Sequence, residues 1–206
     1  MMSGTAQAQA FWADHPPDPA WVAHYASSVG QPHRAVVVDA LRKVPGWSSL
    51  WEVGCHCGPM LWAVQEAFPQ ARLGGCDLNQ EAVDHARQCW PGVRCGAFPA
   101  VSAPLPDASA DVVLSCYTLA YVSPDDLDAA LEEMARLARR AVVLCEPVAW
   151  DGRTGIREDG RFVEWAHPYM HRLMRHDAYQ GWLASCAGLS YDTNHLSGLI
   201  VAERPS

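Results

Sequence analysis

The chain has 206 residues, half of them hydrophobic and 18% charged, which is the composition of an ordinary folded domain. This length is enough for one well-cored α/β domain but short for two. The formal net charge of -8 argues against nucleic acid as the main partner, because nucleic-acid-binding proteins concentrate Lys and Arg on one face.

The first residues, MMSGTAQAQAFW, lack a basic stretch followed by an apolar core, so no secretory signal is expected. No run approaches the ~20 apolar residues that cross a bilayer. We therefore expect a cytoplasmic protein whose eight cysteines are reduced thiols, mostly packed as small core residues.

Residues 1–46 are expected to form an N-terminal tail and a helical cap, with helices near 19–28 and 32–44. From Ser48 onward, short apolar runs alternate with amphipathic segments. Helices are expected after Gly58, after Asn79 as the capping residue, and after Ser123, with arginines at the end of the last one. Strands are predicted at 50–53, 72–77, 92–95, 111–117, 141–146 and 198–203.

Continuous apolar strands that alternate with amphipathic helices are typical of a mostly parallel sheet covered on both faces. Residues 47–206 are predicted to form this single α/β domain, with a lid segment at about 148–176. A helix is expected somewhere within 165–187.

The stretch SLWEVGCHCGPML (49–61) stands at the first strand-to-helix turn, where open α/β sheets bind ligands. Gly54 and Gly58 are expected to let the backbone approach a ligand. Asp77 ends the next strand, 19 residues after Gly58, near the spacing at which an acid meets a ribose diol. The G-x-G-x-x-G pattern of dinucleotide-binding proteins is absent.

Cys55, His56 and Cys57 are adjacent, and adjacent side chains do not all turn toward one tetrahedral ion. The run is therefore interpreted as loop packing, and no metal is expected.

Four segments in order resemble the class I S-adenosylmethionine-dependent methyltransferases, in particular the methyltransferase type 11 group. They are EVGCHCG (52–58), GCDLNQEAVDHAR (75–87), LPDASADVVLSCYTLAYV (105–122) and EEMARLARRAVVLCEP (132–147). The resemblance implies a Rossmann-like fold with a seven-stranded sheet, helices on both faces and an antiparallel last strand. It also implies S-adenosylmethionine as cofactor. Two departures are His56 at the usual middle glycine, and Ala97 and Phe98 where an acid often receives the adenine amino group.

By the same resemblance, the methionine end of the cofactor is assigned to the glycine loop and the ribose to Asp77. The remaining cofactor contacts are assigned around the adenine and beside the end of the fourth strand. The full set of expected cofactor residues is Glu52, Gly54, His56, Gly58, Asp77, Leu78, Ala97, Phe98 and Tyr117. Arg34 either reaches the cofactor carboxylate or, as we expect, is an ordinary surface arginine.

His167 and His171 follow the fifth strand, where the family often builds a substrate lid, and either could act as a general base. An aromatic and polar surface helix explains the same stretch equally well. Aromatic residues expected to contact the substrate are Tyr25, Tyr121, Trp165 and Tyr169, and Trp12 and Trp21 are expected to close the same pocket. The sequence Ser-Cys-Tyr-Thr at 115–118 differs from the Asn/Asp-Pro-Pro-Tyr of enzymes that methylate adenine or glutamine nitrogen.

The sequence thus predicts methyl transfer from S-adenosylmethionine to an O, N or C nucleophile of a small molecule, by a monomer or homodimer that binds neither nucleic acid nor membrane. Two alternatives stay open. One is a non-catalytic cofactor-binding or scaffold protein that keeps the fold, and the other is a nucleotide-dependent oxidoreductase.

Overall fold

A computed structural model describes residues 10–13, 27–149, 155–158, 163–192 and 195–205. The helix expected near 19–28 lies almost wholly outside these residues, as do Trp21 and Tyr25. Within the described part, no helix is long and apolar enough to cross a membrane.

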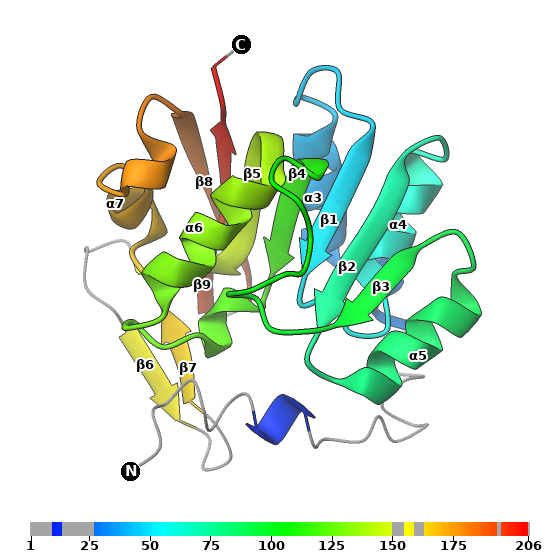
Figure 1. Cartoon of the computed structure of the whole chain (residues 1–206). Helices are drawn as coiled ribbons and strands as arrows, with labels where there is room; N and C mark the ends of the chain where they lie inside the picture. Colours follow the sequence, from blue (N-terminus) through cyan, green and yellow to red (C-terminus); the bar gives the residue numbers. More distant parts are fainter. Residues whose placement is uncertain (1–9, 14–26, 150–154, 159–162, 193–194, 206) are drawn as a thin grey trace.

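The main sheet has seven strands in the order β3-β2-β1-β4-β5-β9-β8. Strands β1 to β5 are parallel, whereas β9 is antiparallel to both of its neighbours, β5 and β8. The sheet predicted from the sequence is therefore confirmed, including its antiparallel last strand (Figure 1). The strands are β1 Ser49–Val53, β2 Arg72–Asp77, β3 Arg94–Ala97, β4 Ala110–Cys116, β5 Ala138–Pro147, β8 Leu183–Asp192 and β9 His195–Glu203.

Helices cover both faces of this sheet, as expected (Figure 1). Leu41, Leu61 and Val83 belong to one apolar layer, which packs the first three helices against the sheet. Leu131 and Leu173 belong to the layer on the opposite face. The helices are α3 Pro32–Leu41, α4 Pro59–Ala67, α5 Gln80–Cys89, α6 Leu127–Leu137 and α7 Tyr169–Leu173, with 3-10 turns η1 Ser28–Gly30, η2 Leu119–Tyr121 and η3 Asp177–Tyr179.

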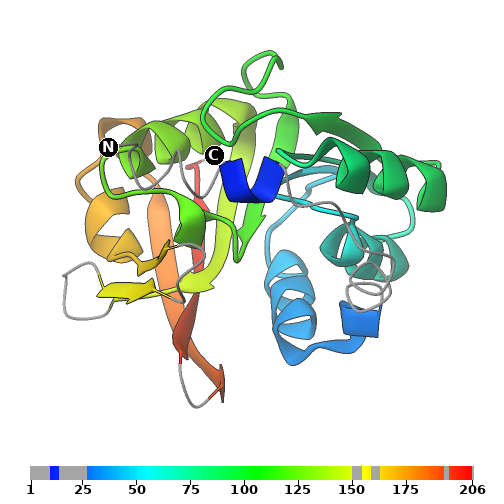
Figure 2. The ribbon, with the colours of Figure 1, turned by 90° about the horizontal axis from the view of Figure 1, so that it is seen from below.

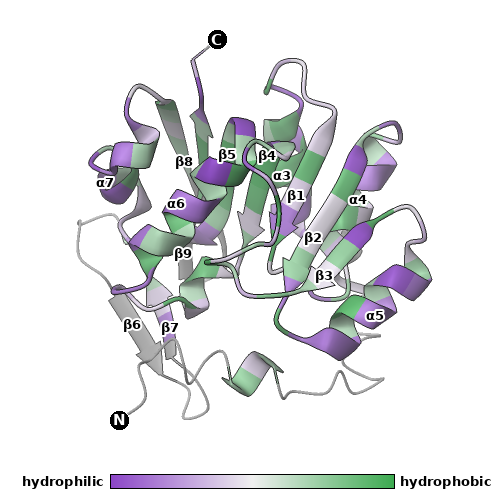
Figure 3. Cartoon of the chain, in the orientation of Figure 1, coloured by the Kyte–Doolittle hydropathy of each residue, from purple (hydrophilic) through white to green (hydrophobic). Residues whose placement is uncertain are grey.

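Hydropathy explains why α6 packs as it does. Its core-facing side chains recur at helical spacing, while its outer side is polar (Figure 3). The helix begins at Leu127 with Asp126 before it, and not directly after Ser123 as predicted; the Ser123 hydroxyl donates to the Asp126 carboxylate at 2.9 Å in the turn before the helix. Of the arginines predicted at the end of this helix, only Arg136 lies in α6. Arg139 and Arg140 lie in the next strand, since β5 already begins at Ala138. The predicted Asn79 cap of α5 is confirmed, with Oδ1 accepting from the Ala82 N–H at 2.9 Å.

The segment after β5 differs most from the expectation. It forms a small antiparallel pair, β6 Gly155–Glu158 with β7 Val163–Ala166, followed by the single-turn α7 and η3. The long strand β8 then pairs with β9, where only the second of these strands was predicted.

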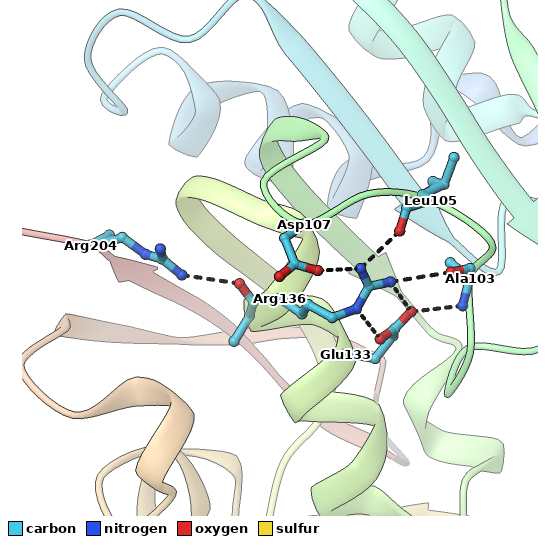
Figure 4. A network of polar contacts seen from close by, with 7 residues as sticks. Ala103, Leu105, Asp107, Glu133, Arg136 and Arg204 are labelled. Atoms are coloured by element: carbon cyan, nitrogen blue, oxygen red, sulfur yellow. Dashed lines mark hydrogen bonds and ion pairs between the residues drawn. The ribbon is translucent and has the colours of Figure 1, made fainter.

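A polar network holds the loop between β3 and β4 against α6 (Figure 4). The Arg136 guanidinium donates to the carbonyls of Leu105 and Ala103 at 2.8 and 3.1 Å, and it pairs with Asp107 and Glu133 at 2.7 Å. The Glu133 carboxylate also accepts from the Ala103 N–H at 2.7 Å. The loop that begins at the carboxyl end of β3 is thereby fixed at its far end.

Candidate functional site

The glycine loop follows β1 and folds over the carboxyl end of β2. The amides of Gly54 and Cys55 both donate to the Cys76 carbonyl, at 2.7 and 2.8 Å. The next amide, of His56, donates to Asp77 Oδ2 at 2.9 Å. Three successive N–H groups of the loop are thus held by the end of the neighbouring strand.

Asp77 joins this loop to the start of α5. While Oδ2 accepts from His56, Oδ1 accepts from the Asn79 N–H at 2.9 Å. The side chain is half-buried, and each carboxylate oxygen accepts one amide bond and keeps a further lone pair for another donor.

Gly54 and Gly58 are required by the backbone conformation and by contacts within the protein. Both have left-handed backbone, with φ of 75° at Gly54 and 88° at Gly58. A Cβ at Gly54 would lie 1.9 Å from Thr118 Oγ1, and one at Gly58 would lie 2.8 Å from the Trp90 ring. Side chains of the same chain therefore occupy the places that Cβ atoms at these glycines would fill. The approach of the loop backbone to a ligand stays a prediction.

His56 is also left-handed, with φ of 46°, which explains why a glycine is usual at this position of the loop. His56 is only 7% exposed. Its neighbours Cys55 and Cys57 are also buried, at 2% and 4% exposure. Among the described residues no group of three His, Cys, Asp or Glu side chains is placed to hold a metal ion.

Glu52 is the acid that precedes the loop, and it is buried at 2% exposure. Burial raises its pKa to about 8, against the opposing charge of Arg34. The Oε2 atom is buried and accepts no hydrogen bond from the part of the chain that the structure describes, which is costly unless another group donates to it. The site therefore fits a ligand that carries an ammonium or N–H group at this point.

Arg34 corrects the expectation of a surface arginine. It is 6% exposed, and its guanidinium donates to the carbonyl and hydroxyl oxygens of Ser28 at 2.8 and 2.7 Å. Its positive charge opposes the rise in the pKa of Glu52 that burial causes.

Glu146 ends β5 and orders the segment after β4. Its carboxylate is fully buried and accepts from the Ser115 hydroxyl at 2.7 Å and from three successive amides, of Thr118, Leu119 and Ala120, at 3.0, 3.2 and 3.3 Å. Burial raises its pKa to about 7, against these four donors. It fixes η2, and with it the Thr118 side chain that packs on Gly54.

The predicted adenine side lies where β2 and β3 end. Leu78 is half-buried and Ala97 is exposed. The Phe98 amide donates to the Asp77 carbonyl at 3.1 Å, while its ring stacks on Trp51 at 6.0 Å between centroids. The structure brings these residues together with Asp77 at one corner of the sheet.

The short helical segment of residues 10–13 lies across the carboxyl edge of the sheet (Figure 2). Asn79 Nδ2 donates to the Trp12 carbonyl at 3.0 Å, and the Trp12 ring meets the Tyr121 ring edge-on at 5.0 Å. Trp12 therefore bridges from the end of β2 to η2. Its role in closing a substrate pocket stays a prediction. The Tyr121 hydroxyl donates to Glu164 at 2.8 Å.

Tyr117 follows β4 with a left-handed φ of 56°. Its hydroxyl shares a 2.6 Å hydrogen bond with Ser197, and its ring lies edge-on to His33 at 5.3 Å. It thus lies beside β9, at the end of the central strands as predicted.

The lid residues divide into buried and exposed members. His167 is fully buried, Nε2–H donates to the Val122 carbonyl at 2.9 Å, and burial lowers its pKa to about 4. Trp165 and Tyr169 pack against it at 5% and 0% exposure, and among the described residues the Tyr169 hydroxyl has no hydrogen-bond partner. His171, the alternative candidate, is exposed on α7.

Sequence reasoning missed three contributors: Glu146, the buried role of Arg34, and the Asn79 bond to the N-terminal segment. An acid that ends a buried apolar strand, as in AVVLCEP, was a readable signal for Glu146. Nothing local in the sequence indicates the contact between Asn79 and Trp12.

Comparison with known proteins gives this geometry a context. Residues 51–141 match the family model described as methyltransferase domain. An uncharacterized 37.1 kDa protein in transposon TN4556 of Streptomyces fradiae is 34% identical over 128 residues, which are 59% of this chain and 36% of that protein. The chain thus spans about a third of the length of this curated relative.

Two solved structures have the same fold. The 1,6-didemethyltoxoflavin-N1-methyltransferase of Burkholderia thailandensis, with bound 1,6-didemethyltoxoflavin and S-adenosylhomocysteine, has a TM-score of 0.72 at 17% identity over 98% of this chain and 88% of its own. The magnesium protoporphyrin IX methyltransferase of Synechocystis, with bound S-adenosylmethionine, has a TM-score of 0.69 at 14% identity over 100% and 99%. Residues 51–141 thus match a methyltransferase domain, and the chain has the same fold as these two methyltransferases.

Proposed function

We propose that this protein transfers a methyl group from S-adenosylmethionine to a small molecule. One observation carries the proposal: within a methyltransferase domain, the glycine loop and Asp77 are tied together at the carboxyl ends of β1 and β2, next to the buried acceptor of Glu52. This edge of an open α/β sheet is where such folds bind ligands.

The residues fit the cofactor in distinct ways. The unsatisfied Oε2 of Glu52 suits the ammonium of the methionine end, and the spare lone pairs of Asp77 suit the ribose hydroxyls. Leu78, Ala97 and Phe98 would surround the adenine without an acid. Gly54, His56, Gly58 and Tyr117 would line the remaining part of the site.

The bound cofactor would supply an electrophilic methyl group, so the protein's task is alignment of the acceptor and exclusion of water. Glu146 holds η2, whose Tyr121 contacts Trp12, so the segment after β4 and the N-terminal segment form one rim. Tyr25, Trp165 and Tyr169 remain predicted substrate contacts. We keep His171 and His167 as candidate bases; His167 is buried, whereas His171 is exposed on α7.

A small-molecule acceptor is supported by the two similar structures, one of which contains bound 1,6-didemethyltoxoflavin while the other is named for magnesium protoporphyrin IX. The acceptor atom is an O, N or C nucleophile. The net charge of -8 supports a protein that binds no nucleic acid. We further propose that the protein is cytoplasmic and is a monomer or a homodimer.

Calorimetry with S-adenosylmethionine and S-adenosylhomocysteine tests the cofactor. Binding is expected in wild type, and no binding at millimolar concentration would overturn the proposal. Turnover is tested by incubating the protein with S-adenosylmethionine labelled on the methyl group and a fractionated small-molecule extract. Cofactor binding without labelled product in any fraction would favour the non-catalytic alternative.

His171→Ala and His167→Ala then separate the candidate bases. A pH-dependent loss of turnover with unchanged cofactor affinity is expected for the residue that acts as base. Equal turnover in wild type and both variants would exclude both histidines as the general base.

A further inference from the structure

The chain path places Arg34 at the carboxyl edge of the sheet. Helix α3 leads into β1 through a turn at the opposite, amino edge, where the Ser49 amide and hydroxyl both donate to Asp111 Oδ2 at 3.1 Å, near the start of β4. α3 therefore runs antiparallel to β1, and its first residues return to the edge that carries the glycine loop. The ring contact of His33 with Tyr117, which directly follows β4, agrees with this position.

The Arg34 guanidinium is held along one edge only. Nε–H donates to the Ser28 carbonyl at 2.8 Å and Nη2–H to the Ser28 hydroxyl at 2.7 Å, and these two nitrogens form one edge of the planar group. The adjoining edge, made of Nη1 and the second Nη2 hydrogen, makes no hydrogen bond or ion pair with a described residue. Arg34 is 6% exposed, and a cation buried to this depth without an anion is costly. The open edge is therefore matched to a ligand with an anionic group.

Glu52 supplies the opposite charge at the same edge of the sheet. It is the last but one residue of β1, directly before the glycine loop, and its buried Oε2 accepts no hydrogen bond from the described residues. Within these residues Arg34 and Glu52 make no ion pair with each other. The electrostatics agree with the chain path, since the charge of Arg34 opposes the rise in pKa that burial causes at Glu52 and at Cys57 of the loop. An unused donor edge and an unused acceptor suit a ligand end that carries both charges.

We propose that Arg34 and Glu52 form a binding site for the zwitterionic end of an α-amino acid, in which Arg34 takes the carboxylate and Glu52 the ammonium. The inference rests on the proposed function, whose cofactor carries such an end. Arg34 precedes the segment 51–141 that matches the methyltransferase domain, so its role belongs to the N-terminal part of this chain. The open guanidinium edge presents two parallel N–H groups, the arrangement that pairs with both oxygens of one carboxylate.

A site of this kind selects among adenosine compounds. A ligand without the carboxylate leaves the guanidinium edge buried and unpaired, whereas a complete amino acid end satisfies it. The site thus favours ligands with an intact methionine or homocysteine end. A dinucleotide carries no α-amino acid and does not match, which weighs against the oxidoreductase alternative.

Calorimetry of the full chain with S-adenosylhomocysteine and with its decarboxylated analogue, which keeps the amine, tests the assignment. The two ligands differ only in the carboxylate, so wild type is expected to bind the analogue at least about thirtyfold more weakly. Arg34→Met removes the cation. It should weaken binding of S-adenosylhomocysteine at least about thirtyfold and change binding of the analogue less than about threefold. Arg34→Lys keeps the positive charge and should restore part of the preference for the carboxylate.

Arg42→Met is the matched control, because Arg42 lies at the other end of α3, is exposed and pairs with Asp39. It should keep wild-type affinity for both ligands. Equal weakening of both ligands in Arg34→Met would mean that Arg34 only supports the fold, and unchanged binding of S-adenosylhomocysteine would exclude the contact. Either result would overturn the proposal.

The comparison of the two ligands on wild type needs no variant. Equal affinity for them would overturn the assignment of Arg34 even if Arg34→Met did not fold, while the cofactor itself would still bind. Absence of binding of both ligands to wild type would instead be a failure of the proposed function. The two failures are therefore distinguishable.

Discussion

Replacement of Glu146 by Gln isolates two opposing effects on one buried carboxylate. Four donors favour the charged form, while complete burial disfavours it, and burial prevails because the pKa rises from 4.5 to about 7. Between these two values the folded protein holds a proton that the unfolded chain has released. Stability is therefore lost as the pH rises through this window and is constant above it.

The magnitude follows from the size of the shift. A rise of this kind corresponds to about 3 kcal/mol in total, of which about 2 kcal/mol falls between roughly pH 5.5 and pH 8.5. Glu146→Gln removes the ionisation but keeps the shape and one acceptor oxygen. Glu52, whose pKa is also raised, is present in both proteins and cancels from the difference.

Urea unfolding of wild type and Glu146→Gln at these two pH values measures the effect. The stability difference is expected to move by about 2 kcal/mol in favour of the variant at the higher pH. A difference that does not change with pH, or one that moves toward wild type, would refute the reasoning. The four hydrogen bonds would then outweigh burial.

Three further predictions concern the loop and its support. Asp77→Ala should weaken S-adenosylhomocysteine binding by at least about tenfold in calorimetry and lower the free energy of unfolding by about 2–4 kcal/mol, since two amide bonds to a carboxylate are lost. His56→Gly should keep that affinity within about threefold, or ~0.7 kcal/mol, because the bond to Asp77 uses the backbone N–H. A larger loss would mean that the imidazole itself binds the cofactor. Arg136→Met should lower the free energy of unfolding by about 2–4 kcal/mol in urea, because Glu133 loses its partner and two carbonyls lose donors. The exposed pair of Arg42 is the control, and Arg42→Met should change stability by less than about 1 kcal/mol.

Local pattern was enough to predict the strands that begin the fold. The prediction at 72–77 coincides with β2, and those at 50–53 and 141–146 fall inside β1 and β5. These runs are apolar because both faces of a parallel strand are covered. β8 was missed because Leu183 to Ala187 are exposed on an edge strand, where no burial pattern marks the sequence.

The candidate site was predictable only where recognisable sequence segments form it. The loop and Asp77 each stand at the end of a predicted strand, at a recognisable spacing, so the sequence indicated both, and the structure joins them through the His56 amide. The Trp12 contact with Asn79 spans 67 positions and is made by a backbone carbonyl, which any residue provides. The depth of Arg34 likewise depends on η1 packing over it, which the polar residues around Ser28 do not reveal.

Gly54 and Thr118 have a consequence for how this loop can change. The two residues are 64 positions apart, yet the hydroxyl of one fills the place where the other would carry a side chain. They form a single steric unit, so a larger residue at 54 is tolerable only with a smaller one at 118 and a backbone that leaves the left-handed region. The glycine loop thus depends on a residue far away in the sequence, because Thr118, which packs on Gly54, lies on the segment that Glu146 holds in place.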